Sequence, residues 1–415
     1  MTAEESVEGP APRSAAPRRR GVVVTALGVV QILAWGSSYY LLAVLAAPIA
    51  RDTGWSLAWI VGALSLGLLV EGLMAPLVGD AIERYGGRPV LAISALLLAA
   101  GLGTLALAPS LPVFVMAWLV IGLGMGAGLY DAAFYTLGRL YGMEARRLIT
   151  YLTLFGGFAS TLCWPLSGFL ETQLGWRGAC AVYAAIQLVV SLPLVLTVIP
   201  QIPRAALRTR QQPPSSADAG LSVSRRNPRR RRQFILIAAS FTITSAVSSV
   251  ISVHLLTMLQ LRGETLAAAV ALGALIGPSQ VGARVVEMLF GQRHHPVWAM
   301  VMSSVFIAIG LGALWVDLTW LSAAIILYGG GMGIRSIVRG SVPLAVFGIE
   351  GYASLMGRLA MPALVVGAVS PFVGAMALER YGLDATLAAL TVAAVASVAL
   401  GVLLLAGLER RTNPA

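Results

Sequence analysis

Residues 79–91, GDAIERYGGRPVL, form a short charged stretch between two long apolar segments, and this stretch decides the fold of the chain. Acidic and basic side chains with apolar runs on both sides belong at the edge of a membrane, where the dielectric constant falls. A degenerate copy, FGQRHHP, follows at residues 290–296, so that Pro89 recurs as Pro296 after 207 residues. The same turn is therefore present twice.

Three further features recur at nearly the same spacing, which indicates a repeat of the whole unit. They are Gly-Met-Gly at 124–126 and 331–333, Pro165 and Pro371, and Gly175 and Gly382, with separations of 207, 206 and 207 residues. Soluble solenoid proteins repeat every ~20–50 residues. A much longer repeat in apolar sequence indicates two membrane bundles of like topology.

Composition identifies the solvent of this chain as a lipid bilayer. Hydrophobic residues make up 58% of the 415 residues, charged residues only 11%, and the mean hydropathy is +0.83. A water-soluble protein of this composition would carry an aggregating surface. The abundant glycine and proline, 45 and 21 residues, are ordinary in membrane helices.

Twelve apolar stretches are long enough to cross ~30 Å of hydrocarbon as helices. They lie near 22–49, 57–78, 89–108, 111–136, 148–170, 177–199, 234–260, 265–289, 297–316, 319–344, 354–377 and 385–407. We expect an all-α membrane protein with two pseudo-symmetric bundles of six transmembrane helices. The expected divisions are a disordered tail over 1–20, bundles over 21–199 and 234–408, a linker over 200–233 and a tail over 409–415.

The distribution of arginine predicts the orientation of the chain. All 29 basic residues are arginines, and with both termini inside, 21 of them fall in cytoplasmic tails and loops and four fall outside. This asymmetry follows the positive-inside rule and accounts for the net charge of +11 without a nucleic-acid partner. We expect a multi-pass protein of a bacterial inner membrane whose termini and linker are cytoplasmic.

The charged stretch closely resembles the signature loop of the major facilitator superfamily. Glycine stands first, an acid fifth, a base sixth, an aromatic residue seventh, glycine eighth and a base tenth, and these residues are Gly79, Glu83, Arg84, Tyr85, Gly86 and Arg88. The family carries Asp at the fifth place and usually a base at the ninth, where this chain has Glu83 and Gly87. The resemblance implies two six-helix bundles around a central cavity that work by rocker-switch alternating access.

This loop is also a candidate gate on physical grounds. A helix N-terminus could receive Glu83, while Arg84 and Arg88 could pair with it or with lipid phosphate, and such contacts bias a two-state equilibrium. The alternative is that these charges are solvated topology markers. Because the copy at 290–296 lacks the acid, gating is expected to be asymmetric between the halves.

Ionisable residues inside the apolar stretches are the best candidates for a binding site, because each costs several kcal/mol in hydrocarbon without a partner or a wet cavity. They are Glu71, Asp131, His254, Arg284, Glu287, Arg335 and Arg339. Glu71 and Asp131 are candidates for ion coupling, with H⁺ as the expected ion. Arg284, Glu287 and Arg358 fit membrane anchors or ion pairs between the bundles. Arg335 is the deepest base, and it either binds an anionic substrate group or pairs with Asp131 or Glu71.

The first apolar stretch offers a polar and aromatic stripe. Gln31, Trp35, Ser38 and Tyr39 share one helical face, and the resemblance implies that the first, fourth, seventh and tenth helices line the cavity. The other expected contributors to an amphipathic substrate site are Tyr130, Asp131, Tyr135, His254, Gln280, Arg335 and Arg339.

We therefore expect a secondary active transporter, a symporter that takes up a small organic solute, anionic or planar aromatic and vitamin-like. The alternative is efflux of amphipathic compounds by proton antiport, although Trp118 and Trp164 stand where the family's proton-coupled exporters carry Arg and Gly. A non-transporting sensor or scaffold is a distant alternative. No enzyme activity, cofactor, metal or nucleic acid is expected; membrane lipids are, and the protein is expected to act as a monomer.

Overall fold

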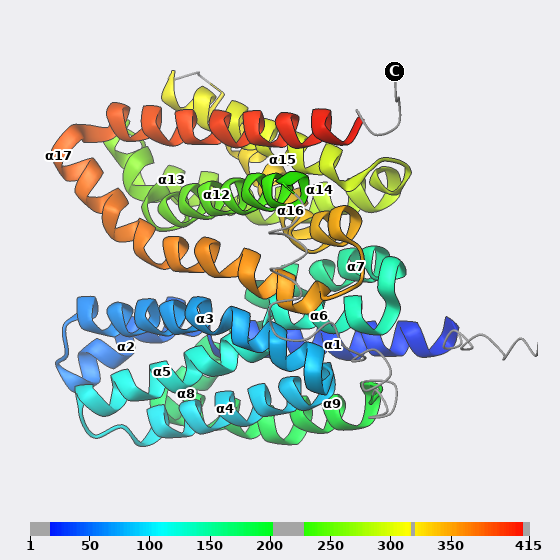
Figure 1. Cartoon of the computed structure of the whole chain (residues 1–415). Helices are drawn as coiled ribbons and strands as arrows, with labels where there is room; N and C mark the ends of the chain where they lie inside the picture. Colours follow the sequence, from blue (N-terminus) through cyan, green and yellow to red (C-terminus); the bar gives the residue numbers. More distant parts are fainter. Residues whose placement is uncertain (1–16, 202–227, 317–319, 410–415) are drawn as a thin grey trace, which may run out of the picture.

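The computed structural model describes residues 17–201, 228–316 and 320–409, and these residues form helices and no strand (Figure 1). The expected all-α fold is therefore confirmed. The first sixteen residues, the last six and residues 202–227 of the expected linker lie outside the described residues. Helical structure begins at Pro17 and resumes at Pro228, a few residues before the expected bundles.

The helices follow one another in two series. The first series is α1 (Pro17–Ser37), α2 (Leu41–Thr53), α3 (Leu57–Tyr85), α4 (Gly87–Leu107), α5 (Leu111–Gly128), α6 (Tyr130–Tyr141), α7 (Ala145–Gly157), α8 (Ala159–Ile186) and α9 (Leu192–Val198). The second series is α12 (Pro228–Leu261), α13 (Leu266–Ala274), α14 (Ile276–Phe290), α15 (Pro296–Trp315), α16 (Leu321–Phe347) and α17 (Tyr352–Glu409). We call them the first and the second half.

Two glycines at equivalent places turn the chain inside helices α8 and α17. Gly175 in α8 has φ 70° and Gly382 in α17 has φ 79°, a region that glycine occupies without steric cost. These residues are 207 apart, so the sequence repeat is also a repeat of backbone geometry. Nine helical stretches in the described ranges are long and apolar enough to span a membrane, and at least two of them contain such a turn. The count of twelve spans stays a prediction.

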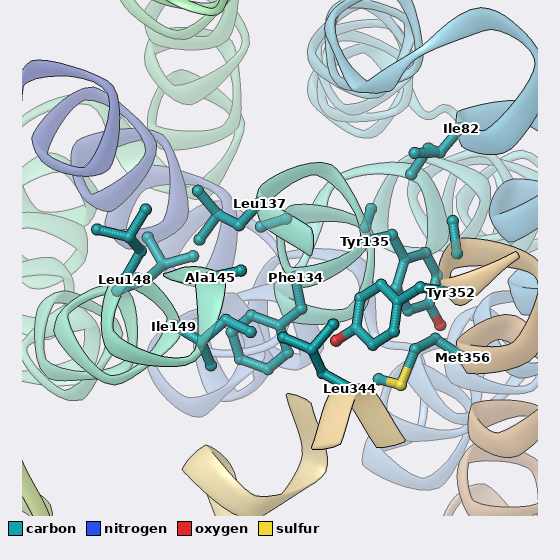
Figure 2. Close-up of a cluster of buried hydrophobic side chains, with 14 of the residues drawn as sticks. Ile82, Phe134, Tyr135, Leu137, Ala145, Leu148, Ile149, Leu344, Tyr352 and Met356 are labelled. Carbon is teal, nitrogen blue, oxygen red and sulfur yellow. The ribbon is translucent and has the colours of Figure 1, made fainter. Parts of the chain in front are cut away.

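The buried core joins the two halves on one side only. We call the side on which α1 begins and α17 ends the tail side, at the right of Figure 1. The core on this side takes buried side chains from both halves (Figure 2), among them Phe134, Tyr135, Ile149, Leu344, Tyr352 and Met356. The other two buried clusters, toward the opposite side, lie within the first half and within the second half. The halves therefore share a core at the tail side and have separate cores beyond it.

Helices α3 and α17 approach each other closely at the tail side because glycines face backbone there. A Cβ atom on Gly79 would lie 2.4 Å from the carbonyl oxygen of Ala353, and one on Gly357 would lie 2.3 Å from that of Ala75. Small residues allow membrane helices to pack backbone against backbone, since lipid offers no hydrophobic drive for association. These two glycines therefore set the distance between the halves.

We predict that Gly357→Ala loosens this contact. The added methyl group has only backbone atoms to displace, so the helices must separate, at a cost of about 1–3 kcal/mol. The unfolding temperature of the purified protein should fall by several degrees. Gly168→Ala is the control, because a Cβ there meets nothing within 4 Å. Equal stability of the two variants would contradict the close contact.

Candidate functional site

The polar stripe on α1 is built around the amide of Gln31. This fully buried side chain donates from Nε2 to the carbonyl oxygen of Gly128 at 2.6 Å and accepts at Oε1 from the indole N–H of Trp35 at 3.2 Å. A buried amide without such partners would cost free energy. Gln31 therefore ties α1 to the end of α5 and orients Trp35, rather than presenting its amide to a solute.

Aromatic rings gather around Trp35. Its ring centroid lies 5.4 Å from that of Tyr39 in an edge contact and 5.2 Å from that of Tyr130, which in turn stacks on Phe134 at 5.3 Å. Ring pairs in such geometries stabilise the structure beyond the effect of burying the rings. The hydroxyl of Ser38 turns back to the carbonyl oxygen of Ala34 at 2.6 Å and is buried, so Ser38 adds no free group to this aromatic cluster.

An ion pair between Asp131 and Arg339 links the two halves. Asp131 lies in the first turn of α6, which begins after the helix break at Leu129, and a carboxylate is favoured at a helix N-terminus. Arg339 comes from α16 in the second half and donates to the Oδ2 atom. Both side chains are largely buried, with 10% and 24% of their surfaces exposed, so each charge depends on the other.

Arg335 and Glu71 lie near the Asp131–Arg339 pair but are not part of it. Arg335, one helical turn before Arg339, donates to the hydroxyl of Ser248 at 3.3 Å, and within the described ranges it forms no ion pair. Glu71 is buried, lies within electrostatic range of Asp131 and Arg339, and forms no hydrogen bond or ion pair of its side chain with any described residue. In the described structure Arg339, and not Arg335, forms the ion pair with Asp131, and it does so through the Oδ2 atom.

A second bridge between the halves lies between α7 and α14. Arg284, buried on α14, donates to the carbonyl oxygen of Thr153 on α7 at 2.7 Å and to the Oε1 atom of Gln280 at 3.2 Å. On the same side, Arg146 donates to the carbonyl oxygen of Gly291 at 2.7 Å. Arg284 thus joins the halves through a backbone carbonyl, and Gln280 orients this arginine.

Two of the predicted cavity residues, His254 and Tyr135, make contacts that were not predicted from the sequence. The Nε2 atom of His254 is 2.8 Å from the carbonyl oxygen of Pro371 in α17, so this ring is held within the second half. Tyr135 is fully buried in the shared tail-side core beside Tyr352 (Figure 2).

The charged loop after α3 is held by a residue that the sequence analysis missed. Arg139, at the end of α6, lies 2.8 Å from the carboxylate of Glu83 and also donates to the Glu83 carbonyl oxygen at 3.1 Å. Arg84 points to the surface. Gly86 has φ 82° and ends the helix, and a Cβ on Gly87 would lie 2.1 Å from the hydroxyl of Thr136. The absent base at position 87 therefore has a steric reason.

The sequence profile of the Major Facilitator Superfamily matches residues 27–338, three quarters of the chain. The chain belongs to the major facilitator superfamily. Similar solved structures include the human organic anion transporter MFSD10 (TETRAN), with a TM-score of 0.73, 18% identity and coverage of 93% of this chain and 100% of that one. The outward conformation of the transporter FucP has a TM-score of 0.72 at 14% identity, over 93% of this chain and 99% of that chain.

Curated relatives of this superfamily member include monocarboxylate transporter 11 of human and of mouse. The human protein is 31% identical over 350 residues, which cover 78% of this chain and 68% of the relative. The mouse protein is 36% identical over 146 residues, 34% of this chain and 30% of the relative. Among the described residues of our chain, no group of three His, Cys, Asp or Glu side chains could hold a metal ion.

We predict that Glu83→Gln lowers transport while leaving expression near normal, because it removes the charge that fixes Arg139 at the end of α6. Transport per folded molecule, in cells expressing matched amounts, measures the effect. Arg84→Gln is the control, since that side chain is exposed. Full transport by Glu83→Gln would leave this loop as a set of solvated charges.

We also predict that the Asp131–Arg339 pair shows strong coupling in a double-mutant cycle. Either Asp131→Asn or Arg339→Gln should lower the free energy of unfolding by about 2 kcal/mol, below the 3–5 kcal/mol of a fully buried pair. The double variant should recover most of this loss, because no buried charge is left unpaired. Denaturant unfolding in detergent measures it, and additive losses would show that the two charges act independently.

Proposed function

We propose that this superfamily member is a secondary active transporter that takes up a small organic anion, a carboxylate, together with H⁺. The observation that carries the proposal is the half-buried guanidinium of Arg335, whose hydrogen bond in the described structure goes to the neutral Ser248. Arginine stays protonated in proteins and its planar fork matches a carboxylate. A positive group of this kind inside apolar helices needs an anion, and a substrate can supply it.

The surroundings of Arg335 agree with an organic anion. Tyr328 on α16 lies within electrostatic range of both Arg335 and Tyr39, which follows α1. A carboxylate on Arg335 would thus extend its organic part toward Trp35, Tyr39 and Tyr130, rings that suit planar or aromatic groups. The names monocarboxylate transporter 11 and organic anion transporter support the same substrate class.

We propose uptake coupled to H⁺. The halves share their buried core at the tail side, and the arginine bias predicts that this side is cytoplasmic, so the conformation described is one that could load a solute from outside. Glu71 supports H⁺ coupling, because a buried carboxylate without a partner is stable when protonated. We propose a bacterial inner membrane as the location, and a monomer of two bundles, 21–199 and 234–408, as the working unit.

Efflux of amphipathic compounds by proton antiport is the second candidate, and the aromatic cluster favours it. Tyr40 extends the rings around Trp35 to Trp164 at 6.1 Å. Proteoliposomes with an imposed pH gradient distinguish the two. Symport accumulates a labelled monocarboxylate on the alkaline side, whereas antiport moves a lipophilic dye toward the acidic side.

We predict that Arg335→Gln raises the apparent KM for a transported carboxylate by one to two orders of magnitude, about 1.5–3 kcal/mol for a charge-assisted hydrogen bond. Initial rates in proteoliposomes measure KM. Ser248→Ala is the control, because it removes the hydrogen bond to Arg335 and leaves the charge. If Arg335→Gln left KM unchanged, a neutral aromatic solute bound by the cluster around Trp35 would replace the proposal.

A further inference from the structure

A cavity of about 720 Å³ lies between α1 and α7 on the tail side, and nothing in the proposed transport cycle uses it. Every residue that lines it belongs to the first half. Its walls come from the start of α1, from the segment before α7 and from the first turns of α7. Neither Arg335 nor a ring of the aromatic cluster is among the lining residues, so the cavity is a different site.

The polarity of the cavity walls changes along helices α1 and α7, from charged side chains at one end to apolar side chains farther along. Arg20, Arg146 and Arg147 line it where the apolar span of α1 begins, and that span starts at Arg20. Val24, Leu154 and Phe155 line it farther along the same two helices. From residue 147 to residue 155 a helix rises ~12 Å, at 1.5 Å per residue. The layering matches the boundary between lipid headgroups and acyl chains.

The cavity has an excess of positive charge. Three arginines and one glutamate line it, and the glutamate, Glu144, pairs with Arg20. Arg147 lies 5.5 Å from the ring centre of Tyr151 and donates to its hydroxyl at 3.0 Å, while Arg146 donates to the Gly291 carbonyl oxygen. Within the described ranges, neither Arg146 nor Arg147 forms an ion pair. Arg147 is exposed, whereas Arg146 is half-buried and also lies within electrostatic range of Glu287 on α14.

We propose that this cavity binds a phospholipid with an anionic headgroup. Arg146 and Arg147 would hold its phosphate, as guanidinium groups do in bidentate contacts, and an acyl chain would lie against Leu154 and Phe155. A soluble phosphate would leave that apolar wall uncovered. The chain segment 202–227 is a poor occupant, because its five arginines and single aspartate would repel the site.

Lipid at this place would act on the contact between the halves. Helix α7, which forms part of the cavity wall, also contacts the second half. Arg146 on α7 donates to the carbonyl oxygen of Gly291, and Arg284 on α14 donates to the carbonyl oxygen of Thr153 on α7. A phosphate that fixes α7 would favour the conformation closed on this side. The bound lipid is thus expected to be a regulator of the transport cycle rather than a substrate.

The test titrates phosphatidylglycerol into the purified full chain in phosphatidylcholine micelles and follows binding by native mass spectrometry. Arg147→Gln should weaken binding about tenfold or more, the loss of one charge-assisted hydrogen bond. Thr25→Trp, which fills the cavity without changing charge, should weaken it as much. Arg230→Gln removes an exposed arginine of α12 outside the cavity and should change binding less than about fivefold.

Two results would overturn the proposal. One is a loss of affinity in Arg147→Gln and Thr25→Trp no larger than in Arg230→Gln, which would mean nonspecific attraction of anionic lipid. The other is stabilisation of the protein in pure phosphatidylcholine by millimolar inorganic phosphate, equal to that by phosphatidylglycerol, which would make the ligand a soluble anion. Should Arg147→Gln fail to fold, Thr25→Trp decides the matter by itself.

Discussion

The cost of charge inside hydrocarbon is the constraint on which the arrangement of the two halves depends. Asp131 and Arg339 come from different halves, and each is buried deeply enough to need a partner. Each of these two charges finds its partner in the other half, so the ion pair holds α6 against α16. The helix break at Leu129 contributes, because it places Asp131 where a helix N-terminus favours a carboxylate.

Other contacts at the tail side also hold the two halves together. Gly79 and Gly357 bring α3 and α17 into backbone contact, Arg284 bridges α14 to α7, and the largest buried core spans both halves there. Beyond this layer each half has a core of its own. Alternating access would have to exchange one set of contacts for another, and Glu71 beside the ion pair offers a group whose protonation could shift that balance.

Sequence patterns predicted what depends on spacing and composition. The 207-residue repeat anticipated the paired turns at Gly175 and Gly382, and the signature loop after α3 indicated the family. The sequence did not reveal which residue each charged or polar side chain would contact. Arg139 for Glu83, Arg339 for Asp131 and the Pro371 carbonyl for His254 all depend on the rotation of a helix about its axis. A hydrophobic face indicates which side of a helix is buried, as in α6, but it does not indicate which side chain of a neighbouring helix lies opposite.

The most direct test of whether the Asp131–Arg339 ion pair holds the halves together is to measure two distances between spin labels, one label of each pair in each half. One pair replaces the exposed tail-side residues Arg84 and Arg293, and the other replaces the exposed residues Leu57 and Leu261 on the opposite side. Asp131→Asn should lengthen the first distance and shorten the second, because the halves then separate at the tail side. If both distance distributions match those of the unchanged protein, the ion pair does not hold the halves together.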